Sequence, residues 1–207
     1  GALHKRLSNL YHRGDSSMNE PGKFDMIKRY IAAWAATFTA MTLAACSSTG
    51  VPENITPVSG FDADRYLGTW YEAARLDHRF ERGLDNVTAN YSLREDGSLR
   101  VLNKGYNTKK TEWETAEGKA YFVGAETSGH LKVSFFGPFY GSYVVFDLDE
   151  DYTRSYVSGP DKSYLWLLTR SPVISDAEKA AFITKAAALG YDTEALIWVD
   201  QSKNAAE

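Results

Sequence analysis

Hydrophobic and polar residues alternate with a period of two through much of the chain from residue 70 to residue 170. This period is typical of β-strands that bury one face. Turn residues such as Glu95-Asp96-Gly97 separate the alternating segments, so the strands are short and close together. The pattern predicts eight strands, at residues 70–76, 87–93, 99–104, 113–123, 131–135, 143–148, 153–158 and 164–170.

The connections between these segments are almost all of hairpin length, which predicts an all-β fold with antiparallel strands in up-and-down order. Closure into a barrel removes exposed strand edges, and eight strands leave an interior wide enough for one small ligand. We expect the long segment 113–123 to carry a bulge at Gly118. The predicted fold is therefore an eight-stranded antiparallel β-barrel.

A helix is predicted after the eighth strand. Ser175 and Glu178 have the spacing of a capping box, and Gly190 suits the position after the last helical residue. Between them runs a narrow apolar stripe formed by Phe182, Ala186 and Leu189. We expect this C-terminal helix to pack outside the barrel and residues 195–199 to form a short final strand.

The N-terminal part of the chain has the features of a secretory signal. Two basic residues, Lys28-Arg29, precede an apolar run at 31–45, which is shorter than the roughly 20 residues of a membrane span. Leu43-Ala44-Ala45-Cys46 resembles a bacterial lipobox, which implies that Cys46 is lipidated and becomes the new N-terminus. The alternative for a single cysteine is a buried free thiol.

These signals divide the chain into four parts. Residues 1–25 are an extra segment of doubtful status, residues 26–45 a lipoprotein signal peptide, residues 46–60 a flexible tether, and residues 61–201 the folded domain. Ser47 follows the cysteine where an aspartate would resemble an inner-membrane retention signal, which favours the outer membrane. With its one cysteine used as an anchor, the domain has no disulfide.

Composition and charge exclude some functions. Residues 1–45 hold six basic and three acidic residues, so the remaining 17 basic and 24 acidic residues carry a net charge of −7. An acidic domain without a basic stripe argues against binding nucleic acid. The domain holds two histidines, His78 and His130, without a nucleophile or a second ligand at suitable spacing. The acidic segment 147–151 lacks the spacing of a calcium loop. We therefore expect no catalytic residues, no metal and no cofactor.

The alternation predicts which side chains point into the barrel. They are Val87, Ala89, Tyr91, Leu93, Leu99, Val101, Asn103, Leu131, Val133 and Phe135, and Trp113 is added as a candidate. Tyr91 and Asn103 would be polar groups in an apolar interior, suited to orienting the head of a ligand. Two alternatives remain open from the residues alone: a hollow barrel that holds a ligand, or a barrel filled by its own side chains.

The start and end of the strand series resemble the lipocalin family. Gly68-x-Trp70 opens the series and the last strand ends in Arg170. In lipocalins the matching arginine packs across the matching tryptophan and closes the base of the barrel, and such cation–π contacts contribute about 0.5–2 kcal/mol. Residues 135–143, 164–166 and 191–199 resemble the bacterial outer-membrane branch of the family, as does the lipobox.

This resemblance implies a lipid-anchored protein at the periplasmic face of the outer membrane. It would bind fatty acids such as palmitate, lysophospholipids or similar amphiphiles for lipid storage or transport, and a homodimer is a candidate assembly. The aromatic loop 137–141 is a candidate contact for lipid or a second subunit. Three alternatives remain: a lipid-modifying enzyme on the same barrel, an interaction module with a filled barrel, and a haem carrier with His130 as axial ligand.

Overall fold

The computed structural model describes residues 49–206. The extra segment 1–25, the signal peptide 26–45 and the lipidation candidate Cys46 lie outside the described residues. Within residues 49–206, no helix has the length and apolar character needed to cross a membrane. The fold and the candidate site both lie in this part of the chain.

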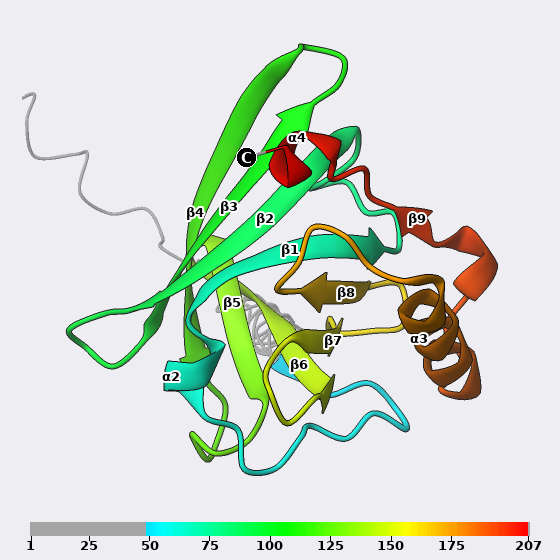
Figure 1. Ribbon diagram of the computed structural model, residues 1–207. Coiled ribbons are helices and arrows are strands. Elements are labelled where there is room, and N and C mark those ends of the chain that lie inside the picture. Colours follow the sequence, from blue (N-terminus) through cyan, green and yellow to red (C-terminus); the bar gives the residue numbers. More distant parts are fainter. Residues whose placement is uncertain (1–48, 207) are drawn as a thin grey trace, which may run out of the picture. The chain divides into compact units, whose positions relative to one another are not determined.

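Eight antiparallel strands follow one another around a closed barrel (Figure 1). β1 pairs with both β2 and β8, and these two pairings close the ring. The predicted up-and-down barrel is thus confirmed. The strands are β1 (Gly68–Arg75), β2 (Leu84–Leu93), β3 (Leu99–Asn107), β4 (Glu112–Phe122), β5 (His130–Phe136), β6 (Phe139–Leu148), β7 (Arg154–Ser158) and β8 (Leu165–Thr169).

The predicted helix is α3, Asp176–Ala188, and it packs outside the barrel. Ser175 and Glu178 form the capping box, with the Ser175 Oγ accepting from the Glu178 N–H at 3.3 Å. Phe182 and Ala186 are fully buried against the outer face of the barrel. Three short elements follow: η2 (Thr193–Ala195), β9 (Ile197–Trp198) and α4 (Ser202–Ala205).

The C-terminal segment fills a gap in the barrel wall. β1 pairs with β2 only as far as Tyr71, and beyond that point β9 pairs with Ala74 and Arg75 instead. The side-chain amide of Gln201 donates to the backbone oxygen of Glu72 at 2.8 Å and to that of Val87 at 2.9 Å. Residues 197–201 therefore bridge the two strands where their direct pairing ends.

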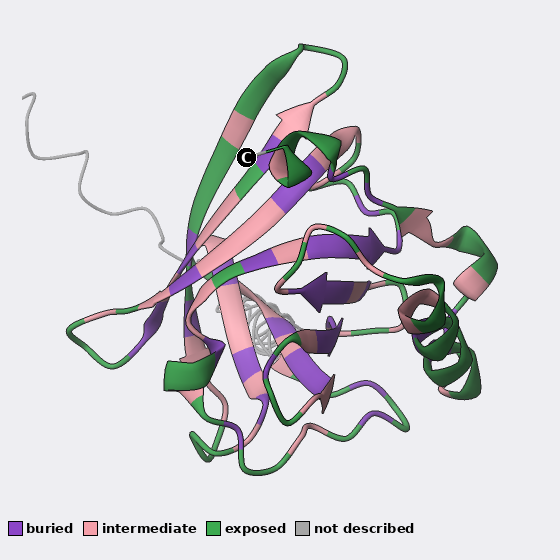
Figure 2. Ribbon diagram, viewed as in Figure 1, coloured by how far each residue is buried: buried purple, intermediate pink, exposed green. Residues whose placement is uncertain are grey.

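Two cores lie on the two faces of the sheet. The outer core, under α3, includes Val144, Tyr156 and Leu167. The inner core fills part of the barrel and includes Val145 and Val157. Neighbouring residues of one strand face different cores because successive side chains point to opposite sides. Figure 2 shows the result, with β8 and the second half of β1 mostly buried and the outer half of β4 exposed.

The described part of the predicted tether is not free. Ile55 is buried in the outer core, and the backbone of Val58 donates to Val145 and accepts from Gly129, each at 2.9 Å. Phe61 donates to the backbone oxygen of Thr127 at 2.9 Å. The prediction of a flexible tether is therefore wrong for residues 49–60, because apolar residues and backbone hydrogen bonds hold this segment against the barrel.

Gly118 does not form the predicted bulge, since β3 and β4 pair without a register shift. A Cβ at this position would lie 2.7 Å from the backbone oxygen of Ser134 and 2.9 Å from Cδ1 of Phe135. The glycine therefore makes room for the Phe135 ring inside the barrel. Register shifts occur elsewhere, between Glu72 and Ala74, Asp85 and Thr88, Val133 and Phe136, and Val145 and Asp147.

Candidate functional site

One end of the barrel, here called the floor, is closed by the helix α2 (Ala63–Tyr66) and by Trp70. Asp62 caps this helix by accepting from the N–H groups of Asp64 and Arg65. The Trp70 ring is fully buried, and its indole N–H donates to the backbone oxygen of Tyr66 at 2.9 Å. The Trp70 ring therefore lies across the start of β1 and blocks the interior at that end.

Arg170 lies on the outer side of Trp70, with its guanidinium carbon 3.9 Å from the ring centroid. Its N–H groups donate to the backbone oxygens of Thr69 and Leu67, each at 2.8 Å, and of Arg65 at 3.0 Å. Partial burial lowers the pKa of Arg170. Gly68 has a φ of 90°, and a Cβ there would be 3.4 Å from an Arg170 nitrogen. These contacts join the start of β1 to Arg170, the residue that follows β8, at the floor.

Above Trp70, a chain of hydroxyl groups fills the lower half of the barrel. Tyr91 donates to the Tyr143 hydroxyl at 2.8 Å, and the Tyr66 hydroxyl lies 2.8 Å from that of Tyr143 and 2.9 Å from Ser155 Oγ. Burial raises the pKa of Tyr66 to about 12 and those of Tyr91 and Tyr143 well above the ordinary value. All three stay neutral, so the lower half is packed and uncharged.

The opposite end, here called the mouth, carries the β1–β2, β3–β4, β5–β6 and β7–β8 connections, because strand directions alternate. Towards it, inward-facing side chains keep part of their solvent exposure. Leu131 is buried, whereas Val133 and Phe135, further along β5, are half-buried. An inward-facing side chain of a closed barrel is exposed only if the interior next to it is open. The upper half of the barrel, towards the mouth, therefore has a mostly apolar lining that solvent reaches.

The predicted lining residues mostly lie on the inner face. Val87, Tyr91, Val101 and Leu131 are buried there, and Asn103, Val133 and Phe135 are half-buried, as is Ala89. Leu93 is 57% exposed because β2 has passed the last residue that pairs with β1.

Trp113 does not join this group. It pairs with Tyr106, which lies an odd number of residues from Asn103 and therefore on the outer face of the sheet. There the Lys104 ammonium lies 4.2 Å from the Trp113 ring centroid. The lining prediction for Trp113 is corrected accordingly.

The two predicted polar lining groups differ in their availability. The Tyr91 hydroxyl is used within the hydroxyl chain. The side-chain oxygen of Asn103 is buried and has no hydrogen-bond partner within residues 49–206. A buried polar atom without a partner costs about 1–3 kcal/mol, which a bound polar group would recover. Asn103 is therefore the better placed of the two to contact the head of a ligand.

A buried group of charged side chains lies at the mouth and was not predicted. Arg75, with 2% exposure, donates to the Glu72 carboxylate at 2.7 Å. It also donates to the backbone oxygens of Glu81 and Leu84, each at 3.0 Å, and so holds the β1–β2 connection to the barrel. The Glu81 carboxylate accepts from the indole N–H of Trp166 at 3.1 Å and lies 2.8 Å from Nε2 of His78.

The two carboxyl groups of this cluster have opposite pKa shifts. Burial and the neighbouring Glu81 raise the pKa of Glu72 well above its ordinary value, despite Arg75. Burial also favours the neutral form of Glu81, but the hydrogen bond and charge of His78 bring its pKa below the ordinary value. The pKa shifts therefore favour the protonated form of Glu72 and the ionised form of Glu81.

One sign of this cluster was present in the sequence. Glu72 lies two residues after Trp70 and thus on the same face of the strand. The position of Arg75 had no such sign, because the register shift between Glu72 and Ala74 reverses the alternation and turns Arg75 inward. His78, which carried no sign of burial in the sequence, is 8% exposed.

His130 lies on the outer face of the sheet, paired with Val144. Its Nε2 is within 3.1 Å of the backbone oxygen of Thr49 and 3.0 Å of Ser142 Oγ, and burial lowers its pKa. The proposed role as a haem ligand inside the barrel is therefore wrong. Within residues 49–206, no group of three or more His, Cys, Asp or Glu side chains has the arrangement of a metal site.

The closed barrel, its plugged floor and its apolar upper half define a lipocalin. The lipocalin-like domain family matches residues 61–201, and the chain belongs to this family. Lipocalins are binding proteins, so this chain is a binding protein and not an enzyme.

Two bacterial relatives match most of the chain. It is 55% identical over 173 residues to the outer membrane lipoprotein Blc of Escherichia coli (strain K12), covering 84% of this chain and 98% of that protein. It is 58% identical over 153 residues to the protein of the same name from Vibrio cholerae, covering 73% of this chain and 90% of that protein. Insecticyanin from the tobacco hornworm Manduca sexta shares the fold, with a TM-score of 0.60, 20% identity, and coverage of 75% of this chain and 89% of that chain.

Proposed function

We propose that this protein is a lipid-anchored lipocalin of the outer membrane that binds fatty acids, lysophospholipids or similar amphiphiles in the upper half of its barrel. It would store or carry lipids at the periplasmic face, with Cys46 as the acylated anchor. The names of the bacterial relatives support the anchor and the location. The observation that carries the ligand class is the exposure retained by apolar side chains that face inward.

The upper half suits a single amphiphile for a physical reason. An acyl chain entering from the mouth would displace water from Val133, Phe135 and Ala89, and each buried methylene contributes about 0.8 kcal/mol. The hydroxyl chain beneath limits how deep the ligand reaches. The Asn103 side chain offers the ligand head a polar contact on the otherwise apolar lining.

Titration of the delipidated protein with a fluorescent fatty acid tests this function. We expect saturable binding at about micromolar concentration or tighter. Val133→Trp places a large ring in the open half and should weaken binding at least about tenfold, since it displaces several methylene contacts. Lys132→Trp changes the neighbouring, outward-facing position and should leave the affinity unchanged.

Absence of saturable binding to the unmodified protein would contradict the ligand claim. Equal affinities for the Val133→Trp and Lys132→Trp variants would place the ligand outside the barrel. Circular dichroism of both variants checks that each is folded.

A further inference from the structure

Exposed phenylalanine side chains gather at the mouth. Phe136 is 68% exposed and Phe139 is 79% exposed, and the two pair across the β5–β6 turn. Phe80, in the β1–β2 connection, is 55% exposed. Both connections lie at the same end of the barrel because strand directions alternate. Large apolar side chains gathered at one end of a protein mark a surface that contacts a partner.

The N-terminal segment lies against the outer face of β5 and β6, the two strands whose hairpin carries Phe136 and Phe139. The backbone oxygen of Thr49 lies 3.1 Å from Nε2 of His130, which in turn lies 3.0 Å from Ser142 Oγ. Ser142 is three residues from Phe139 along β6, which is about 10 Å in a strand. The chain is thus held beside the β5–β6 hairpin before it reaches the anchor.

The remaining length of chain is short. Three residues separate Thr49 from Cys46, and a fully extended chain spans at most about 3.6 Å per residue, or about 11 Å in total. An acyl group on Cys46 therefore lies within roughly 20 Å of the outer face of β5 and β6, whereas a fully extended 15-residue tether could reach about 54 Å. Because residues 49–60 are held to the barrel, the domain cannot stand away from the bilayer that holds its anchor.

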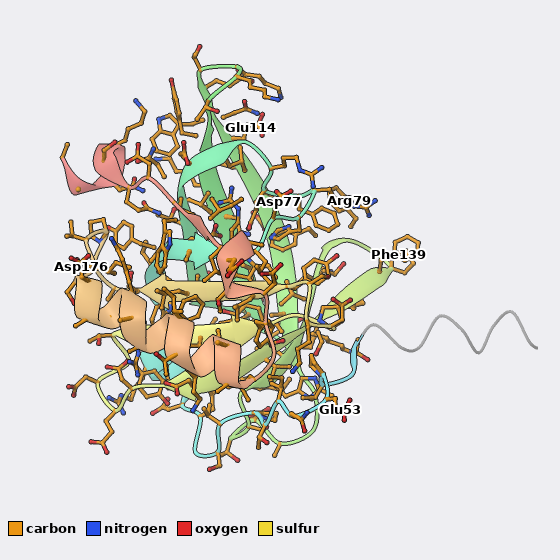
Figure 3. The ribbon with its side chains drawn as sticks, turned by 90° about the vertical axis from the view of Figure 1, so that its right-hand side faces the viewer. Glu53, Asp77, Arg79, Glu114, Phe139 and Asp176 are labelled. Carbon is orange, nitrogen blue, oxygen red and sulfur yellow. The ribbon has the colours of Figure 1, made fainter. Side chains whose placement is uncertain are left out.

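Resting on the proposed lipid anchor, we propose that the mouth docks on the membrane surface, with Phe136 and Phe139 inserted among the lipids. Phe80 is a second contact, and the Arg79 guanidinium lies 4.8 Å from its ring centroid. A cation beside an exposed ring suits the lipid–water interface, where the ring enters the acyl region and the charge meets phosphate groups. Figure 3 shows Phe139 and Arg79 projecting from the same side of the barrel.

This orientation has a consequence for ligand exchange. The open half of the barrel faces the bilayer, so an amphiphile enters or leaves without its acyl chain crossing water. The anchor keeps the protein at the membrane, and the phenylalanines select which end of the barrel meets it. Transfer between vesicle and protein should therefore depend on Phe136 and Phe139, whereas equilibrium affinity for a dissolved ligand should not.

The first experiment measures depth in the bilayer. The acylated protein is placed in vesicles of phosphatidylethanolamine and phosphatidylglycerol after Phe139→Cys, which gives it one free thiol for an NBD label. We expect blue-shifted NBD emission that brominated acyl chains quench. Leu93→Cys and Val173→Cys, at positions of comparable exposure away from the mouth, are the matched controls. NBD at these positions should show the emission of a probe in water, without quenching by brominated acyl chains.

Equal quenching at all three positions, or none at position 139, would overturn the docking proposal. A blue shift at position 139 that persists without vesicles and grows with protein concentration would also overturn it, in favour of a second copy of this chain covering the phenylalanines. Neither result involves a bound ligand, so the proposed lipid-binding function is judged separately by titration in solution.

The second experiment measures transfer. Phe136→Ser with Phe139→Ser should slow uptake of a fluorescent fatty acid from vesicles at least about tenfold, because even one inserted phenylalanine contributes that much to docking. Leu93→Ser with Val173→Ser should leave the rate unchanged. Unchanged uptake by the phenylalanine variant contradicts docking. Absence of fatty-acid binding to the unmodified protein in solution contradicts the proposed lipid-binding function instead.

Discussion

The floor and the mouth of the barrel both hold buried polar groups, but the groups differ in kind. At the floor, Tyr66, Tyr91 and Tyr143 stay neutral, and Arg170 lies over an aromatic ring with backbone oxygens as acceptors. At the mouth, Glu72 and Arg75 are buried with Glu81 and His78 around them.

This difference separates a floor whose charge does not depend on pH from a mouth cluster whose charge does. Tyrosines with a raised pKa do not change charge in the ordinary pH range, so the floor responds little to pH. The mouth cluster holds the β1–β2 connection through carboxyl groups, and its hydrogen bonds depend on which of them carries a proton. Three substitutions test the contrast.

The largest effect is expected at the floor. Trp70→Ala removes a fully buried ring, the base of the Arg170 contact and a hydrogen bond, and should lower the free energy of unfolding by about 3–5 kcal/mol. Denaturant titration measures this value. Trp198→Ala, at a partly exposed position on β9, is the control and should cost far less. Similar losses for both would mean that Trp70 does not close the barrel.

A slightly smaller effect is expected at the mouth. Arg75→Met keeps the length of the side chain but leaves the Glu72 carboxyl group and the backbone oxygens of Glu81 and Leu84 without their donor, which should cost about 3 kcal/mol. Hydrogen exchange should show faster exchange in residues 76–84 than in the strands. Arg82→Met removes an exposed ion pair with Asp77 in the same connection and should change stability little. Uniform acceleration throughout the barrel would contradict a local role.

The smallest effect is a change in pH dependence. Because the pKa of Glu72 is raised, the native protein binds more protons than the unfolded chain above pH 4.5, and its stability falls as pH rises towards the raised value. The slope is at most about 1.4 kcal/mol per pH unit. Glu72→Gln resembles the protonated form and should remove this fall.

The measurement is the free energy of unfolding from pH 4.5 upwards, towards the raised pKa of Glu72. Glu117→Gln, at an exposed carboxyl group paired with Arg100, is the control and should keep the slope of the unmodified protein. If Glu72→Gln also keeps that slope, Glu72 is ionised in the native state and the assignment of the proton is wrong.

The amino-acid sequence by itself determined the strands, their order and the helix. Alternation along Val87 to Leu93 and the capping box at Ser175 are local signals, because hydrogen bonding and burial act on near neighbours. It also predicted which side chains, from Val101 to Phe135, face inward, since a regular strand keeps one face inward.

Only the tertiary structure decided the rest. A single extra residue between Glu72 and Ala74 turned Arg75 into the barrel, and no local pattern marks that shift. The N-terminal segment looked like a tether because Pro and Ser are common in it, yet Ile55 finds a buried site on the barrel. Burial of this kind depends on surfaces distant in the sequence, and these contacts hold residues 49–60 against the barrel wall.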